Sequence, residues 1–288
     1  MLICLARRLS PSLMRSFPGD PGNYKHHFLL AFLMNDKGYF LFTRQEAPGA
    51  GERYRTYVAR LCMLENPFLS HLEVPLACKQ GTETFSVARA GLFGPLGAEL
   101  AAQLPGRQPK ASGESALYIE FGSSLTSETS ALCVFTLSQI DNTVEEIRKA
   151  CYHGDVNKAR TEYVHSVHCK LQSRPNSDLD CGADHLPHPI AGLQPILATS
   201  VLTHIFPRRI TAIAVLTEDN LTIAFLGDRN GHITKVYVQG NEISDDGVMV
   251  YGLSSAVSRH MIFDLSWEHF YAMSETQVGK HQVIVPRQ

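Results

Sequence analysis

Runs of alternating apolar residues, broken by short polar turns, constrain the fold of this chain more than any other feature. The clearest example is TIAFLGDRNGHITKVYV, residues 222–238, where two alternating runs flank Asp228, Arg229, Asn230 and Gly231. An Asn-Gly pair between alternating runs predicts a β-hairpin turn, because both central residues of such a turn take positive φ. The first half of an EF-hand loop is the other interpretation, but no acidic residue follows at its twelfth position. We therefore predict a turn between two strands.

The same pattern of strand, turn and strand recurs along the chain, in residues 26–64, 116–137, 209–238 and 260–286. Each of these segments contains short runs rich in Val, Ile, Phe, Tyr and Thr, the residue types that favour strands. Sequence identity between the segments is weak, so the repeat lies in the pattern. A sandwich would fit the number of strands, but the short turns of the third segment favour an all-β fold of the β-propeller type.

Helices are expected only in short insertions. The segment SQIDNTVEEIRKACY, residues 138–152, predicts an amphipathic helix that lies on the blades. Its apolar face consists of Ile140, Val144, Ile147 and Cys151. Asn142 and Glu145 have the spacing of a helix-capping pair. A shorter helix is expected near residues 97–104.

The overall charge excludes some classes of partner. The chain has 26 Lys and Arg against 28 Asp and Glu, a net charge of −2, and it lacks a basic stripe for nucleic acid. No apolar run is long enough to cross a bilayer, and the apolar part of MLICLARRL is too short for a signal peptide. No catalytic serine, cysteine or lysine signature is present. We predict no enzymatic activity, no cofactor and no small-molecule substrate. The single tryptophan, Trp267, is expected to pack inside a blade.

The cysteines raise a conflict about the cellular compartment. Of seven cysteines, Cys4 stands apart in the N-terminal tail, and the other six lie between Cys62 and Cys181. An even set suggests three disulfides and an extracellular protein, whereas the missing secretion signal argues for the opposite.

A zinc site is the alternative use of the Cys/His-rich segment 165–188. Imidazole and thiolate groups are the ligands that zinc prefers. The candidates are His165, His168, Cys169, Cys181, Asp184, His185 and His188. Their spacing contains neither CxxC nor HExxH, which favours histidines in a loop that ends at a disulfide. An intracellular zinc protein remains the alternative hypothesis; the favoured one includes no metal.

One glycosylation sequon is present. Asn220-Leu221-Thr222 is the only N-x-S/T triplet in the chain, and it lies in the polar stretch LTEDNLT between two strands. A glycan on Asn220 is expected to project from this turn without disturbing the sheet, although such triplets also occur by chance.

Several longer segments resemble the sema domain of the plexin family, B-type plexins most and D-type plexins next. These segments are RLCMLENPFLSHLEVPLAC, SALCVFTLSQID, CGADHLPHPIAG, ITAIAVLTEDNLTIAFLGDRNGHITKVYV and DLSWEHFYAMSETQVGKHQVIVP. They occur in the family's order within residues 22–288. The resemblance implies that the cysteines pair as Cys62–Cys181, Cys78–Cys133 and Cys151–Cys169, which leaves Cys4 free.

The resemblance also implies a fold and a function. Residues 21–288 are expected to form a partial sema β-propeller, about four of its seven blades, whereas residues 1–20 match nothing in the family and are expected to be disordered. The implied function is non-enzymatic recognition of semaphorin ligands on the extracellular side of the plasma membrane, with a second plexin or a co-receptor as further partners. A truncated isoform without ligand binding is the alternative.

Overall fold

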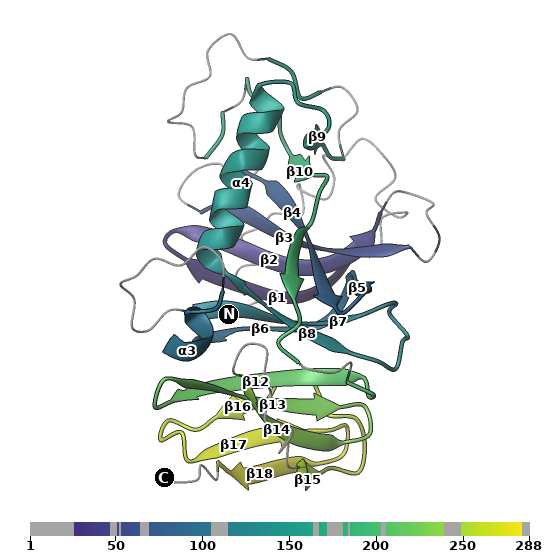
Figure 1. Ribbon diagram of the computed structural model, residues 1–288, viewed down its shortest axis with the longest axis vertical. Coiled ribbons are helices and arrows are strands. Elements are labelled where there is room, and N and C mark those ends of the chain that lie inside the picture. The colour runs from purple at the N-terminus through teal and green to yellow at the C-terminus, as the bar shows by residue number, and fades with distance from the viewer. Residues whose placement is uncertain are drawn as a thin grey trace. The chain divides into compact units, whose positions relative to one another are not determined.

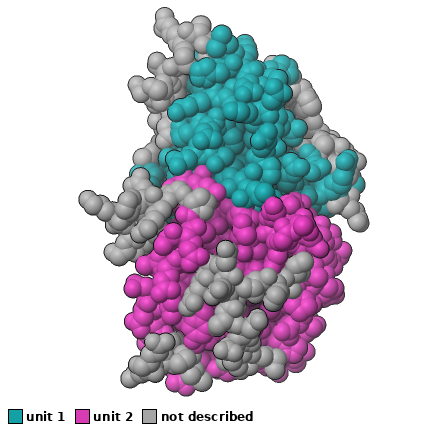
Figure 2. Space-filling view, viewed as in Figure 1, with its two compact units in different colours: residues 1–77, 140–197 teal, residues 78–139, 198–288 magenta. Residues whose placement is uncertain are grey.

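Strands dominate the computed structural model, which confirms the all-β prediction (Figure 1). It describes residues 26–46, 51, 53–63, 69–104, 115–163, 167–171, 181–183, 185–202, 206–238 and 249–283. The segment 1–20, expected to be disordered, lies outside these residues. The chain divides into two compact units, coloured in Figure 2. Unit 1 comprises residues 1–77 and 140–197, and unit 2 comprises residues 78–139 and 198–288.

Unit 1 is built on an antiparallel meander of four long strands. These are β1 (His26–Met34), β2 (Lys37–Gln45), β3 (Tyr54–Cys62) and β4 (Leu72–Gln80), whose last three residues belong to unit 2. Asn35 and Asp36 both have positive φ, which gives the tight turn between β1 and β2. Short β10 (Ile190–Gly192) pairs in parallel with β4 and antiparallel with β9 (Ala159–Thr161). The sheet order is therefore β1-β2-β3-β4-β10-β9, and β5 (Glu83–Phe85) and β11 (Ile196–Thr199) also pair with β4.

The long helix α4 (Leu137–Tyr152) confirms the predicted amphipathic segment. Its buried residues include the four that the apolar pattern indicated: Ile140, Val144, Ile147 and Cys151. The predicted cap at Asn142 is wrong, because the helix begins five residues earlier. The Oγ1 of Thr136 instead accepts the Gln139 N–H at 3.2 Å, which satisfies a free amide of the first turn.

Unit 2 contains three antiparallel sheets. The first has β6 (Val87–Pro95), β7 (Ser115–Gly122) and β8 (Ala131–Thr136); the second has β12 (Ile210–Glu218), β13 (Leu221–Asp228), β14 (His232–Val238) and β15 (Met249–Gly252); the third has β16 (Ile262–Phe263), β17 (His269–Met273) and β18 (Val278–Gln282). The expected short helix is α3 (Ala98–Ala101). Several strands that the four-segment pattern omitted, such as β4 and β6, complete these sheets.

Two apolar clusters join the sheets of unit 2. One cluster packs the first sheet against the second and includes Tyr118, Leu132, Val215 and Leu226. The other packs the second sheet against the third, shown in green and yellow in Figure 1, through Phe225 and Phe270, whose ring centroids lie 4.7 Å apart. Sheets packed face to face through alternating apolar residues are the arrangement expected of neighbouring blades.

The predicted hairpin at residues 228–231 forms, but its turn differs from the expected two-residue type. Arg229, Asn230 and Gly231 make a three-residue loop, and only Gly231 has positive φ, at 89°. A Cβ on Gly231 would lie 2.3 Å from the carbonyl oxygen of Leu253, so the close backbone contact also requires glycine. The Oδ1 of Asp228 accepts the N–H groups of Asn230 and His232, which uses the acidic residue to hold the turn.

The prediction for Trp267 is wrong. Its side chain does not pack inside a blade: it lies in the turn between β16 and β17 and is 54% exposed. The residue type suggested burial, but the polar turn around it places the ring at the surface.

Candidate functional site

Six of the predicted site residues form three disulfides. Cys62 is bonded to Cys181, Cys78 to Cys133 and Cys151 to Cys169, the same pairs that the family resemblance implies. Cys4 lies outside the described residues. The first and third bonds lie within unit 1, and the second lies within unit 2. The first bond spans 119 residues and the third only 18, so the two close loops of very different length.

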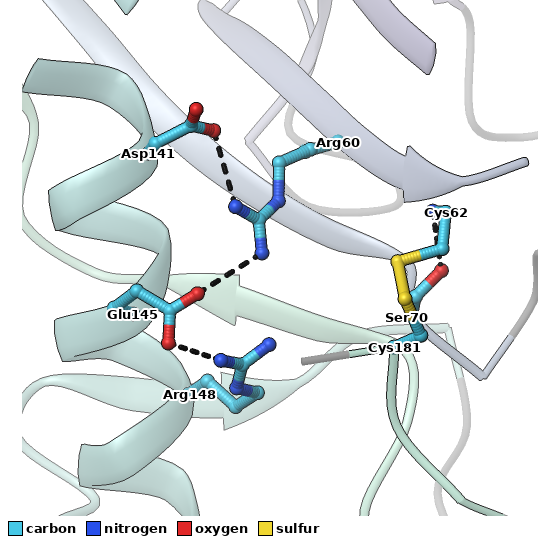
Figure 3. The surroundings of a disulfide bond; sticks show 7 residues. All are labelled: Arg60, Cys62, Ser70, Asp141, Glu145, Arg148 and Cys181. Atoms are coloured by element: carbon cyan, nitrogen blue, oxygen red, sulfur yellow. Dashed lines mark hydrogen bonds and ion pairs between the residues drawn. A yellow bond between two sulfur atoms is a disulfide. The ribbon is translucent and has the colours of Figure 1, made fainter. Parts of the chain in front are cut away.

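An ion-pair network borders the Cys62–Cys181 bond (Figure 3). Arg60 on β3 is almost fully buried and donates to Asp141 at 3.1 Å and to Glu145 at 3.2 Å, both on α4. Arg148 donates to the second oxygen of Glu145. The network fastens helix α4 to β3 where the disulfide also constrains that strand.

The Cys/His-rich segment does not assemble into a zinc site in the described part of the chain. Cys169 and Cys181 are both in disulfides, so neither offers a thiolate. His188 points its Nδ1 to the carbonyl oxygen of Leu186 at 2.8 Å. His165 and Asp184 lie outside the described residues, and no group of three His, Cys, Asp or Glu that would suit a metal is found among the described ones.

The sequon lies at the tip of the β12–β13 hairpin. Asp219 and Asn220 both have positive φ and form the turn, and Asn220 is exposed. Thr222, in contrast, is fully buried, and its hydroxyl oxygen accepts the N–H of Gly97 at 2.9 Å. The folded chain therefore presents the acceptor asparagine while it uses the threonine for packing.

A buried polar cluster in unit 1 was not predicted. Its centre is an ion pair between Arg44 on β2 and Glu73 on β4, 2.9 Å apart and both essentially without solvent exposure. The other carboxylate oxygen of Glu73 accepts from Tyr163 at 2.6 Å and lies 3.2 Å from His71. Arg44 also pairs with Glu162 at 3.2 Å.

The cluster shifts the ionisation of its members. Burial would raise the pKa of Glu73, but Arg44 and the hydrogen bonds from His71 and Tyr163 outweigh it and hold that pKa at about 2. Burial and the neighbouring Glu73 raise the pKa of Tyr163 well above its ordinary value. Glu73 is therefore a fixed anion and Tyr163 a fixed hydrogen-bond donor.

A second buried ion pair, Arg89 with Glu120, lies in unit 2. Arg89 on β6 donates to both oxygens of Glu120 on β7, and Ser130 adds a hydrogen bond to one of them. Arg89 also donates to the carbonyl oxygens of Ser127 and Thr129 and so holds the loop before β8. Sequence reasoning missed these pairs, although charged residues inside apolar runs such as ALYIEFG were the available signal.

These arrangements hold segments of the chain together. Arg44 joins β2 to β4 across the intervening β3, Arg89 joins the neighbouring strands β6 and β7, and the disulfides and the α4 network fix loops and a helix to the sheets. No helix in the described residues is long and apolar enough to cross a membrane. The described residues thus form a scaffold of sheets held by disulfides and buried ion pairs.

Comparison with known proteins shows what this scaffold resembles. The sequence model of the Sema domain family matches residues 100–264, more than half of the chain. Plexin-B1 of Homo sapiens is 32% identical over 284 residues, which cover 91% of this chain and 13% of that protein. The solved extracellular region of Plexin A4 superposes with a TM-score of 0.77 at 24% identity, over 96% of this chain and 24% of that one.

A second solved structure extends the likeness of fold. Drosophila Semaphorin 1a, extracellular domains 1–2, gives a TM-score of 0.61 at 16% identity, over 90% of this chain and 56% of that one. The sheets described above are therefore those of a sema β-propeller, and this chain spans only a small part of the plexins that it matches. On the evidence of its sheets and of residues 100–264, the chain belongs to the Sema domain family, and its curated relatives are plexins.

Proposed function

We propose that this chain is part of the extracellular semaphorin-binding sema domain of a plexin-type receptor. Residues 21–288 would supply about four blades of that propeller, and the activity would be recognition of another protein, not catalysis. The observation that supports this most is the family match over residues 100–264, together with the plexin relatives. A second plexin or a co-receptor is the further partner class.

The physical properties of the scaffold agree with recognition. Protein interfaces depend on surface area and a few buried anchor residues, so they need no catalytic constellation. The sheets of both units are held by buried ion pairs and disulfides. A rigid surface loses little conformational entropy on binding, which favours a specific complex.

The direct test is binding of the oxidised chain to semaphorin ectodomains. The chain, secreted behind an added signal peptide, would be immobilised and exposed to purified ectodomains from several semaphorin classes. Saturable binding to at least one class is expected, and the same chain after reduction of its disulfides should bind none. Failure of every class to bind a folded, oxidised chain would favour the truncated isoform without ligand binding.

We also propose that the six cysteines are oxidised in cells and that Asn220 carries an N-glycan. Intact mass and thiol labelling would test both on chain secreted from mammalian cells. We expect one reactive thiol before reduction, seven after it, and a mass loss on glycosidase treatment that Asn220→Asp abolishes. Six or seven reactive thiols at the outset would mean that the cysteines are reduced, and a rise from six to seven with a chelator would support the intracellular zinc hypothesis.

A further inference from the structure

The exposed Trp267 forms part of a cavity in unit 2. The cavity has a volume of about 360 Å³. Its lining residues are Pro95, Leu216, Thr217, Glu218, Trp267 and Val283. It is near the lower end of the size range of ligand sites, which suits a single side chain better than a large molecule. Strands β6 and β12, the turn that carries Trp267 and the residue after β18 thus meet around one small, mostly apolar hollow with a single acidic residue.

The turn that carries Trp267 is preorganised. The Oδ1 of Asp264 accepts the N–H groups of Glu268 and His269 at 3.1 and 3.2 Å, and its Oδ2 lies 2.9 Å from the Nδ1 of His269. The indole packs on Phe263, with ring centroids 5.1 Å apart. A ring held in this way loses little freedom when a ligand stacks on it.

Glu218 brings an unmet hydrogen-bonding capacity to the cavity. Its Oε2 is buried and has no hydrogen-bond partner among the described residues. Glu218 interacts electrostatically with Lys235. The ammonium group of Lys235 lies 5.3 Å from the ring centroid of Tyr237. A buried carboxylate oxygen without a donor is costly, so a cationic donor that enters the cavity would be stabilised there.

We propose that this cavity receives the side chain of an arginine from a partner protein. The planar guanidinium would stack on the indole of Trp267 and donate hydrogen bonds to the carboxylate of Glu218. Pro95, Leu216 and Val283 would contact the methylene groups of the side chain. Charge complementarity selects a basic partner segment. The inference concerns the cavity alone and does not depend on the partner being a semaphorin.

The test is direct because Trp267, the single tryptophan of the chain, lines this cavity, so its emission in the folded chain responds to a ligand bound there. The oxidised full chain, carrying Asn220→Asp so that no glycan stands on the neighbouring turn, would be titrated with Nα-acetyl-arginine-N-methylamide. The citrulline analogue, which has the same shape without the charge, and matched NaCl are the controls. We expect a saturable change in emission with the arginine probe, half-complete below about 50 mM, and none with citrulline.

Two variants test whether the carboxylate of Glu218 binds the arginine probe. Glu218→Gln should weaken binding of the arginine probe about tenfold, since a charged hydrogen bond is lost. Glu275→Gln removes an exposed acidic residue in the turn between β17 and β18, outside the cavity, and should change nothing. An equal response to arginine and citrulline, or no saturable response, overturns the proposal on the unmutated cavity alone, even if Glu218→Gln fails to fold. A Glu218→Gln chain with unchanged circular dichroism and unchanged affinity would also overturn it.

Discussion

Two buried arginine–glutamate pairs, Arg44–Glu73 in unit 1 and Arg89–Glu120 in unit 2, use the same chemistry in different surroundings. In unit 1 both carboxylate oxygens of Glu73 accept hydrogen bonds. One oxygen accepts from Arg44, and the other accepts from Tyr163 and His71. In unit 2 one oxygen of Glu120 accepts from both Arg89 and Ser130, and the other oxygen accepts from Arg89 only. Each oxygen of Glu73 therefore has two donor groups, whereas one oxygen of Glu120 has a single donor group.

Burial raises the pKa of both carboxyl groups, but the net shift has opposite sign in the two pairs. The pKa of Glu73 falls to about 2, because its donors outweigh the loss of solvent. The pKa of Glu120 rises above its ordinary value, because burial outweighs the hydrogen bonds and charge of Arg89. The balance of burial against hydrogen bonds and nearby charge therefore differs between the two pairs, and with it the contribution to stability that we expect of each carboxylate.

The largest effect is expected for Glu73→Gln. An amide has one acceptor and one donor, so in either orientation its NH₂ group faces Arg44 or Tyr163, which are donors themselves. Arg44 would also lose its main counter-charge, and we expect unit 1 to lose about 3–5 kcal/mol of stability at pH 7. Urea unfolding followed by hydrogen exchange in β2 and β3 would measure it. A loss under about 1 kcal/mol would mean that Glu162 alone can neutralise Arg44.

A smaller loss is expected for Glu120→Gln. The amide oxygen can take the position of the oxygen that accepts from Arg89 and Ser130, while the NH₂ group replaces the less satisfied one. Arg89 also loses its counter-charge, but it keeps its hydrogen bonds to the carbonyl oxygens of Ser127 and Thr129, so we expect unit 2 to lose about 1.5–3 kcal/mol, the usual range for hydrogen bonds to a charged group. Trp267, the only tryptophan, lies in unit 2, so its fluorescence during urea unfolding would report this loss. A loss equal to that of Glu73→Gln would contradict the expectation that Glu120 contributes less to stability than Glu73 does.

The pH dependence of the two losses should have opposite sign. The stability that ionised Glu73 provides is complete above the unfolded pKa of about 4.5 and disappears as the pH falls through about 2. The loss in Glu73→Gln is therefore constant from pH 7 to about pH 5 and shrinks only below that. Glu120 has a raised pKa, so its contribution is complete below about pH 4.5 and is lost as the pH rises through the raised value.

Acidification from neutral pH should consequently increase the loss in Glu120→Gln. Unfolding curves of the original chain and both variants, recorded at several pH values down to pH 4.5, would measure the two slopes. Parallel slopes would show that the surroundings of the two carboxyl groups do not differ in the way their hydrogen bonds indicate.

Local features of the fold were predictable from the sequence, whereas the buried arginine–glutamate pairs were not. The hairpin turn at Asp219 and Asn220 and the buried face of α4 follow from residues within a few positions of one another. Arg44 and Glu73 are 29 residues apart, and Arg89 and Glu120 are 31 apart, so only the strand register brings them together. The type of a residue was also misleading where its position decided the outcome: Trp267 belongs to a turn and is therefore exposed.

The smallest effect sets the scale for the others. Arg229 and Glu128 form the same type of pair, 2.7 Å apart, but both side chains are more than half exposed. Water already solvates these charges, so removal of one leaves no buried partner, and Glu128→Gln should change the stability of unit 2 by less than about 1 kcal/mol. The same tryptophan-detected urea unfolding as for Glu120→Gln would measure it, ideally at low and high salt. If Glu128→Gln destabilised unit 2 as much as Glu120→Gln does, burial would not be what makes the Arg89–Glu120 pair important.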